Sequence, residues 1–122
     1  MGYLTRNTSH SFGWFMQRIS AIFLAAGLLI HFWVLHFTIE RPVTFEKVQS
    51  RLHSPMWIVF DILLLAAAIY HALNGAWNIT LDYNPSASFK KVFGWFLFFI
   101  GVALVGIGVY IIIPFSIVGG VQ

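Results

Sequence analysis

The stretch "MWIVFDILLLAAAIYHALNGAWNITLDY", residues 56–83, decides the fold of this chain. Residues 56–81 contain a single acidic residue, Asp61, and no lysine or arginine. A helix rises about 1.5 Å per residue, so about 20 apolar residues cross the roughly 30 Å hydrocarbon core of a bilayer. Backbone polar groups in lipid must be satisfied within the segment itself. The run therefore predicts a transmembrane helix rather than a strand.

Two further apolar runs, at about residues 14–38 and 92–117, flank the first. The 122 residues are 59% hydrophobic and only 9% charged, whereas about a quarter of a typical soluble domain is charged. We therefore predict an all-α membrane protein, a single transmembrane domain over residues 1–122 with helices at about 14–38, 56–81 and 92–117. The chain has no cysteine, which excludes disulfides, thiolate metal sites and an iron–sulfur cluster held by this chain.

The connections between the runs carry most of the charge. After Pro42, the first connection predicts a short amphipathic helix at the membrane surface, with Glu46, Lys47 and Arg51 facing water. The second connection, "DYNPSASFKK" at residues 82–91, predicts a tight turn. Pro114 is expected to kink or end the third helix.

Two further patterns concern packing and orientation. Gly94, Gly101 and Gly108 recur at intervals of seven and predict a face for close packing against a neighbouring helix or a partner subunit. Four lysines and arginines lie on the side of the N-terminus and the second connection, against three on the other side. Counting positive charges therefore favours a cytoplasmic N-terminus, and the basic balance bears on this orientation rather than on nucleic acid.

A stripe of polar and small residues runs along the end of the second run. His71, Gly75, Asn78 and Asp82 share one face of a helix, with Asn74 at its edge. Ionisable residues within spanning segments are functional candidates by default. A glycine one turn from a histidine leaves the space that a flat porphyrin needs beside an imidazole that ligates its iron. The alternative is that the histidine only packs and hydrogen-bonds.

The first run repeats this pattern around His31. Gly27 precedes it by one turn, and Ser20 continues the same face. His36 follows five residues later, about 140° around a helix, and lacks a neighbouring glycine. We therefore take His31 as the candidate haem ligand of this run and keep His36 in reserve. For both histidines, packing and hydrogen bonding are again the alternative.

Arg18 and Tyr83 are expected at one membrane surface. Arg18 lies in the first turn of the first predicted helix, and Tyr83 closes the second beside Asp82. These residues are either interfacial anchors or a site for the polar head of a lipid-soluble substrate, whose carbonyl accepts a hydrogen bond from the phenol. Measured from this surface, His31 and His71 lie at nearly equal depths, about 20 Å and about 18 Å along ideal helices.

Two segments of the sequence resemble a known family. The segments "MQRISAIFLAAGLLIHFWVLHF" and "YHALNGAWNITLDY" look like the membrane-anchor subunits of succinate:quinone oxidoreductase, respiratory complex II. The likeness is greatest to the smaller hydrophobic anchor, a cytochrome b type subunit with three helices. The first segment matches that anchor's R-x-S-A opening of helix one, and the second matches its H-x₃-G-x₆-D-Y ending of helix two. The resemblance covers all three helices.

The resemblance implies roles for individual residues. His71 is an axial ligand of haem b, and a partner anchor subunit supplies the other ligand. Tyr83 hydrogen-bonds a quinone carbonyl beside Asp82, and Arg18 lies near the haem propionates and the quinone. His31 is similar to the helix-one ligand of the two-haem members. The residues expected to pack around haem are Gly75, Gly27, Asn78 and Ser20.

The resemblance also implies a place in an enzyme. The chain would be a hydrophobic membrane anchor of a succinate dehydrogenase or fumarate reductase, part of a heterodimeric haem-binding bundle with a second anchor subunit. It would dock the iron–sulfur and flavoprotein subunits, hold one or two haems b, and pass electrons to quinone, while succinate is oxidised elsewhere. The expected location is the cytoplasmic membrane of a bacterium or archaeon, with the mitochondrial inner membrane less favoured. The alternatives are a b-type cytochrome subunit of another quinone-linked dehydrogenase and a structural anchor without cofactor.

Overall fold

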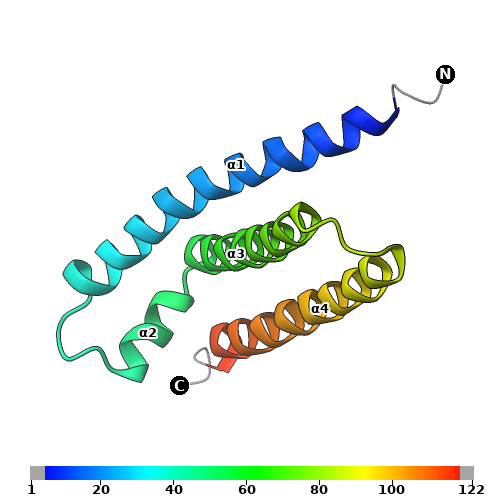
Figure 1. Cartoon of the computed structure of the whole chain (residues 1–122). Coiled ribbons are helices and arrows are strands. Elements are labelled where there is room, and N and C mark those ends of the chain that lie inside the picture. Colours follow the sequence, from blue (N-terminus) through cyan, green and yellow to red (C-terminus); the bar gives the residue numbers. More distant parts are fainter. Residues whose placement is uncertain (1–4, 119–122) are drawn as a thin grey trace.

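The computed structural model describes residues 5–118 and contains four α-helices with one π-helical turn (Figure 1). In chain order the elements are α1 (Thr5–Trp33), η1 (Val34–Thr38), α2 (Phe45–Leu52), α3 (Pro55–Asp82) and α4 (Ala87–Val118). Three segments are long and apolar enough to cross a membrane: Ser11–Thr38, Pro55–Asp82 and Ala87–Ile113. This confirms the predicted all-α membrane fold with three transmembrane helices. Residues 1–4 and 119–122 of the predicted single domain lie outside the described residues.

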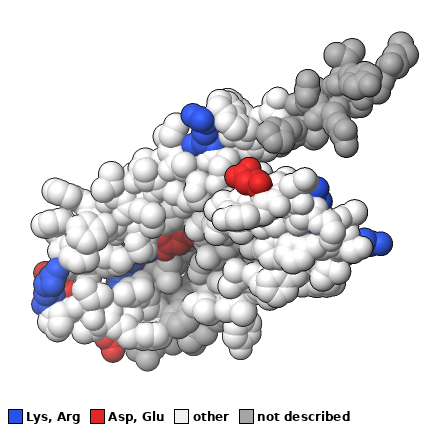
Figure 2. Space-filling view, in the orientation of Figure 1, with Lys and Arg blue, Asp and Glu red and all other residues white. Residues whose placement is uncertain are grey.

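Helix α3 lies between α1 and α4 and packs against both (Figure 1). The chain buries little of its own apolar surface: Ile22 and Leu29 on α1 and Phe99 on α4 are 72%, 71% and 64% exposed. Figure 2 shows one face of the molecule, on which most of the surface is uncharged. Apolar side chains exposed to this extent require lipid or a partner protein around the long helices.

The glycine face of α4 packs against α3, as the spacing predicted. Gly94, Gly101 and Gly108 oppose Trp77, Leu73 and Leu65 of α3, respectively. A Cβ atom added at Gly101 would lie 2.8 Å from Cδ1 of Leu73, and one added at Gly108 would overlap the side chain of Leu65. The glycines therefore allow a closer approach of the two helices than alanine would. Of the two predicted neighbours of this glycine face, a helix or a partner subunit, the structure shows a helix of the same chain.

Helix α1 begins earlier than predicted. It starts at Thr5 rather than near residue 14, so the polar lead-in continues the helix. Arg18 consequently lies about three and a half turns from the start of α1, not in its first turn. The apolar pattern marks where a helix meets lipid or protein, and a helix can extend beyond that point into polar surroundings.

The second connection is shorter than predicted. Asn84 has a φ of 47°, a left-handed conformation that asparagine tolerates, and Pro85 follows it. The Oγ atom of Ser86 then accepts a hydrogen bond from the backbone N–H of Phe89 at 3.3 Å. This cap starts α4 at Ala87 rather than at residue 92. At its other end, α4 continues past Pro114 to Val118, so the proline does not end the helix.

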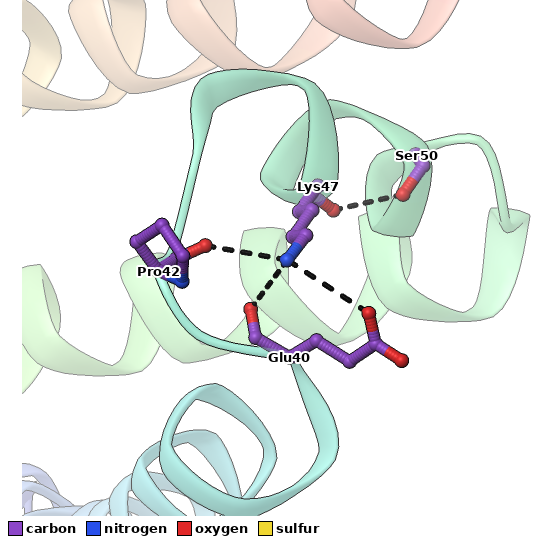
Figure 3. A network of polar contacts seen from close by, with 4 residues as sticks. All are labelled: Glu40, Pro42, Lys47 and Ser50. Carbon is purple, nitrogen blue, oxygen red and sulfur yellow. Dashed lines mark hydrogen bonds and ion pairs between the residues drawn. The ribbon is translucent and has the colours of Figure 1, made fainter.

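The short helix predicted after Pro42 is α2, and hydrogen bonds tie the preceding loop onto it (Figure 3). The Lys47 ammonium donates to the backbone carbonyls of Glu40 at 2.8 Å and of Pro42 at 3.4 Å. Its Nζ atom also lies 4.0 Å from the Glu40 carboxylate. The Ser50 hydroxyl donates to the carbonyl of Lys47 at 2.9 Å. The position of α2 at the membrane surface stays a prediction.

The prediction that Arg51 faces water is wrong. Its side chain is 8% exposed and forms an ion pair with Asp61 of α3, whose side chain is 14% exposed. The guanidinium carbon lies 5.0 Å from the ring centroid of Trp57. A charge at this depth requires a counter-charge, and Asp61 supplies it because α2 folds back onto α3. The pair therefore fastens the connecting helix to the central transmembrane helix.

Candidate functional site

A pocket of about 480 Å³ lies between α1 and α3, towards the C-terminal end of α3. It is lined from α1 by Trp14, Gln17, Arg18 and Ala21, and from α3 by His71, Asn78, Leu81 and Asp82. The antiparallel packing of α1 and α3 brings the two sequence motifs to one cavity. The pocket thus joins the predicted haem ligand, His71, to the predicted quinone-site residues Arg18 and Asp82.

The imidazole of His71 is held against α1 by two polar side chains. The Ser20 Oγ atom lies 3.0 Å from His71 Nδ1, and the Gln17 Nε2 atom lies 3.5 Å from His71 Nε2. The Gln17 amide also donates to the backbone carbonyl of His71 at 3.2 Å. Ser20 is buried, with 6% of its surface exposed. The ring orientation is therefore fixed by contacts between helices rather than by α3 alone.

Asn74 completes this polar network. Its amide nitrogen donates to Oε1 of Gln17 at 2.7 Å and lies 3.5 Å from the carbonyl of Gly13. Polar groups that bridge helices in lipid stabilise their packing because no water is available to replace them. Asn74 therefore supports the position of Gln17 and, through it, of His71.

Arg18 and Asp82 share the pocket without forming an ion pair with each other. The guanidinium carbon of Arg18 lies 4.0 Å from the ring centroid of Trp14, which is a cation–π contact. Among the described residues, the ion pairs are those of Lys47 with Glu40 and Arg51 with Asp61. The Asp82 carboxylate and the Arg18 guanidinium are therefore not neutralised by one another.

Tyr83 caps the C-terminal end of α3 and is 83% exposed. It follows Asp82 directly but does not line the pocket between α1 and α3. The phenol faces the surroundings of the chain, where a substrate or another subunit can reach it. The sequence prediction placed Arg18 and Tyr83 at the same depth. With contacts pairing residues 17–20 with 71–74, Arg18 instead lies level with the turn around His71.

The two glycines predicted to make room for haem lie in the contact between α1 and α3. A Cβ atom added at Gly27 would lie 2.6 Å from Cδ1 of Leu64, and one added at Gly75 would lie 3.1 Å from Nε2 of Gln17. Close helix approach is thus one reason for a glycine at each position. The predicted haem-packing role of these glycines stays a prediction.

His31 and His71 lie at different depths, so the near-equal depth expected from sequence is wrong. His71 is level with Ser20, whereas Gly27, one turn before His31, lies against Leu64, which precedes His71 by seven residues on α3. Along α1, Ser20 and His31 are separated by about 16 Å. The error arose because Arg18 was assumed to be level with Tyr83, whereas the contacts between α1 and α3 place it level with the turn around His71.

His36 lies in the π-helical turn at the end of α1 and is exposed. Its ring stacks on Phe32 with centroids 4.0 Å apart, and its Nδ1 atom lies 3.2 Å from the Phe32 carbonyl. Within residues 5–118, no group of three or more histidine, cysteine, aspartate or glutamate side chains is arranged to hold a metal ion. None of the described histidines is therefore part of such a cluster within the chain.

Sequence reasoning missed two residues of the pocket, Gln17 and Trp14. Gln17 lies three residues before Ser20, on the same helix face, and is the amide that contacts His71. Trp14 precedes Arg18 by four residues, which places an aromatic ring one turn from a cation. These spacings were the available signals, but both residues sit in a run whose apolar character suggested lipid contact.

Comparisons with known proteins find a family and relatives to which this chain is similar. The family described as "Succinate dehydrogenase/Fumarate reductase transmembrane subunit" matches residues 4–109. The chain is 32% identical over 81 residues to a succinate dehydrogenase hydrophobic membrane anchor subunit of Thermoplasma acidophilum, covering 66% of each chain. It is 34% identical over 71 residues to the protein of the same description from Archaeoglobus fulgidus, covering 58% of this chain and 61% of the relative. The chain thus spans slightly less than two thirds of the length of these curated relatives.

Proposed function

This chain belongs to the family of succinate dehydrogenase/fumarate reductase transmembrane subunits, and we propose that it anchors such a complex, binds haem b and forms part of a quinone site. The observation that carries the proposal is the pocket between α1 and α3, where His71, Arg18 and Asp82 line one cavity. Ionisable residues within spanning segments are functional candidates by default, and here a histidine, a cation and a carboxylate line one cavity without forming an ion pair among the described residues. Membership of this family favours the complex over other quinone-linked dehydrogenases.

The residues present fit a haem held from one side. His71 offers a single imidazole at the wall of the pocket, and Arg18 offers a cation for a propionate carboxylate. When bound, haem b supplies reversible one-electron transfer. His71 would hold the iron, and the second axial ligand would come from a partner anchor subunit. His31, about 16 Å along α1 from the level of His71, is the candidate ligand for a second haem, with His36 in reserve.

The quinone site is proposed at the end of α3. Asp82 lies in the pocket, and Tyr83 presents its phenol outside it. The phenol would donate a hydrogen bond to a quinone carbonyl, and the Asp82 carboxylate would help to deliver protons during reduction. From there to His71 the distance along α3 is about 18 Å.

The end of the molecule that carries Asp82 and Tyr83 also bears on the orientation of the chain in the membrane and on its partner subunits. We expect the N-terminus on the cytoplasmic side, because positive charges favour it. The iron–sulfur subunit would then dock near Asp82, Tyr83 and the lysines of α4, with the flavoprotein subunit beyond it. The exposed apolar faces of α1 and α4 would be covered by lipid and by the second anchor subunit.

The absorbance spectrum of the purified complex tests the haem assignment. The dithionite-reduced complex should show the bands of a bis-imidazole haem, and His71→Ala should lose those of one haem. His53→Ala, which changes a histidine outside the three spanning segments, serves as the control and should keep the full spectrum. If His71→Ala also keeps it in an assembled complex, His71 is not a ligand.

A second candidate function is a structural anchor in which His71 only packs. The observation that favours it is that both ring nitrogens of His71 lie within hydrogen-bonding range of a side chain of α1. The same spectrum separates the two functions, because a packing histidine contributes no haem band.

A further inference from the structure

We propose that Ser20 is a positioning residue that fixes the tautomer of His71, so that Nδ1 carries the proton and Nε2 is free to bind iron. The inference rests on the proposed function, because it concerns how this chain prepares His71 as a haem ligand. It is carried by the hydrogen bonds that join Gln17, Ser20, His71 and Asn74.

The hydroxyl of Ser20 has one proton and two contacts. Its Oγ atom lies 3.0 Å from the backbone carbonyl of Gln17 and 3.0 Å from Nδ1 of His71. A carbonyl oxygen only accepts hydrogen bonds, so the hydroxyl proton is directed to it. Both hydrogen bonds then form together only if the Nδ1–H group of His71 donates to Ser20 Oγ.

The other side of the ring gives the same assignment independently. Asn74 donates to Oε1 of Gln17 at 2.7 Å, which orients the Gln17 amide with its Nε2 towards His71. An amide nitrogen only donates, so His71 Nε2 accepts and carries no proton. Both sides of the imidazole therefore select the Nδ1–H tautomer, the form in which Nε2 has an available lone pair.

The contact at Nε2 is weak enough to be replaced. Its length of 3.5 Å is at the limit of hydrogen bonding, whereas the bond from Ser20 is 3.0 Å. The Gln17 amide also donates to the backbone carbonyl of His71 at 3.2 Å. The amide therefore keeps one hydrogen-bond partner when iron takes the lone pair of His71 Nε2. The Ser20 bond, in contrast, lies at a buried residue and does not compete with water.

Partners of this kind tune metal-ligating histidines. An acceptor at the second ring nitrogen fixes the ring and raises its basicity, and its loss typically costs about 10- to 100-fold in metal affinity or activity. We therefore expect Ser20→Ala to weaken haem retention about 10- to 100-fold. The same change should raise the midpoint potential of that haem, because a less basic imidazole stabilises the ferric form less.

The test uses the whole purified complex and two readouts other than turnover. The readouts are the midpoint potential of the haem, followed by its absorbance, and its transfer to an excess of apomyoglobin. Ser20→Thr keeps the hydroxyl and should retain both wild-type values. Ser50→Ala is the matched control, because the Ser50 hydroxyl also donates to the carbonyl three residues earlier but has no histidine partner.

The outcomes separate this inference from the proposed function. A raised potential and faster haem transfer in Ser20→Ala, with both restored in Ser20→Thr, support it. Wild-type potential and haem transfer in Ser20→Ala, where His71→Ala loses the haem, overturn it and leave the proposed function standing. An assembled complex that keeps its full haem content in His71→Ala overturns both. If Ser20→Ala does not assemble, Ser20→Cys decides, because a thiol is a weak acceptor of similar shape: a raised potential supports the inference, and an unchanged one overturns it.

Discussion

Replacing Asp61 by alanine should destabilise the anchor strongly, because it leaves the Arg51 charge buried without a counter-charge. The side chains of Arg51 and Asp61 are 8% and 14% exposed, and they pair directly. Removing one partner of a buried ion pair typically costs about 3–5 kcal/mol. We expect a loss of this size in Asp61→Ala and a similar loss in Arg51→Ala, which leaves the carboxylate alone.

The double replacement should behave differently from the sum of the single ones. Arg51 Nε, Arg51 Nη1 and Asp61 Oδ1 are buried without hydrogen-bond partners among the described residues. Imperfectly satisfied pairs recover little of their desolvation cost, so hydrophobic replacements of similar volume are often neutral or stabilising. We therefore expect the free energy of unfolding of the double variant Arg51→Met with Asp61→Leu to lie within about 1 kcal/mol of the wild-type value or to exceed it.

Thermal unfolding of the purified complex in detergent, followed by circular dichroism, measures these differences. The matched control is Glu40→Gln, which removes the exposed Lys47–Glu40 ion pair but keeps the hydrogen bonds from Lys47 to the backbone carbonyls; such a pair contributes about 0–1 kcal/mol. If the single variants unfold at the same temperature as the wild type, the Arg51–Asp61 pair is not buried in the assembled protein. A double variant as unstable as both single losses combined would refute the argument that desolvation outweighs the attraction.

Two further predictions concern helix packing and the quinone site. Gly108→Val should destabilise the chain by about 1–3 kcal/mol, because a Cβ at Gly108 overlaps the side chain of Leu65 on α3. Gly106→Val is the control, because its Cβ lies in open space and should have little effect. Equal unfolding temperatures of the two variants would contradict the packing. Tyr83→Phe should slow quinone reduction while leaving succinate oxidation by artificial acceptors intact, because only the phenol hydroxyl is lost; equal loss of both activities would exclude Tyr83 from the quinone site.

The long helices were predictable because their signals are local. The run that forms α3 ends at Asp82, where Asn84 and Pro85 break the helix, and its predicted bounds differ from the structure by one residue at each end. The glycine spacing on α4 likewise predicted a packing face. Length, apolar character and helix breakers lie within each segment, so they can be read without knowledge of the tertiary fold.

The depth of the site residues was not predictable, because it depends on how α1 and α3 align. The polar residues after Thr5 gave no apolar signal, so the start of α1 was placed too late. Arg18 was placed level with Tyr83, whereas contacts across the two helices place it level with the turn around His71. The network around His71 depends on Gln17, which meets its partners only through packing across more than fifty positions in sequence. The burial of Arg51 likewise requires α2 to fold back onto α3.

The central claim is that the pocket between α1 and α3 joins a haem-ligating histidine to the quinone site. The haem content of the assembled complex tests this claim most directly. It should be measured per complex in the wild type and in His71→Ala by conversion to the pyridine haemochrome. Loss of one haem per complex in His71→Ala is the expected result. An unchanged haem count in a fully assembled variant would contradict the account.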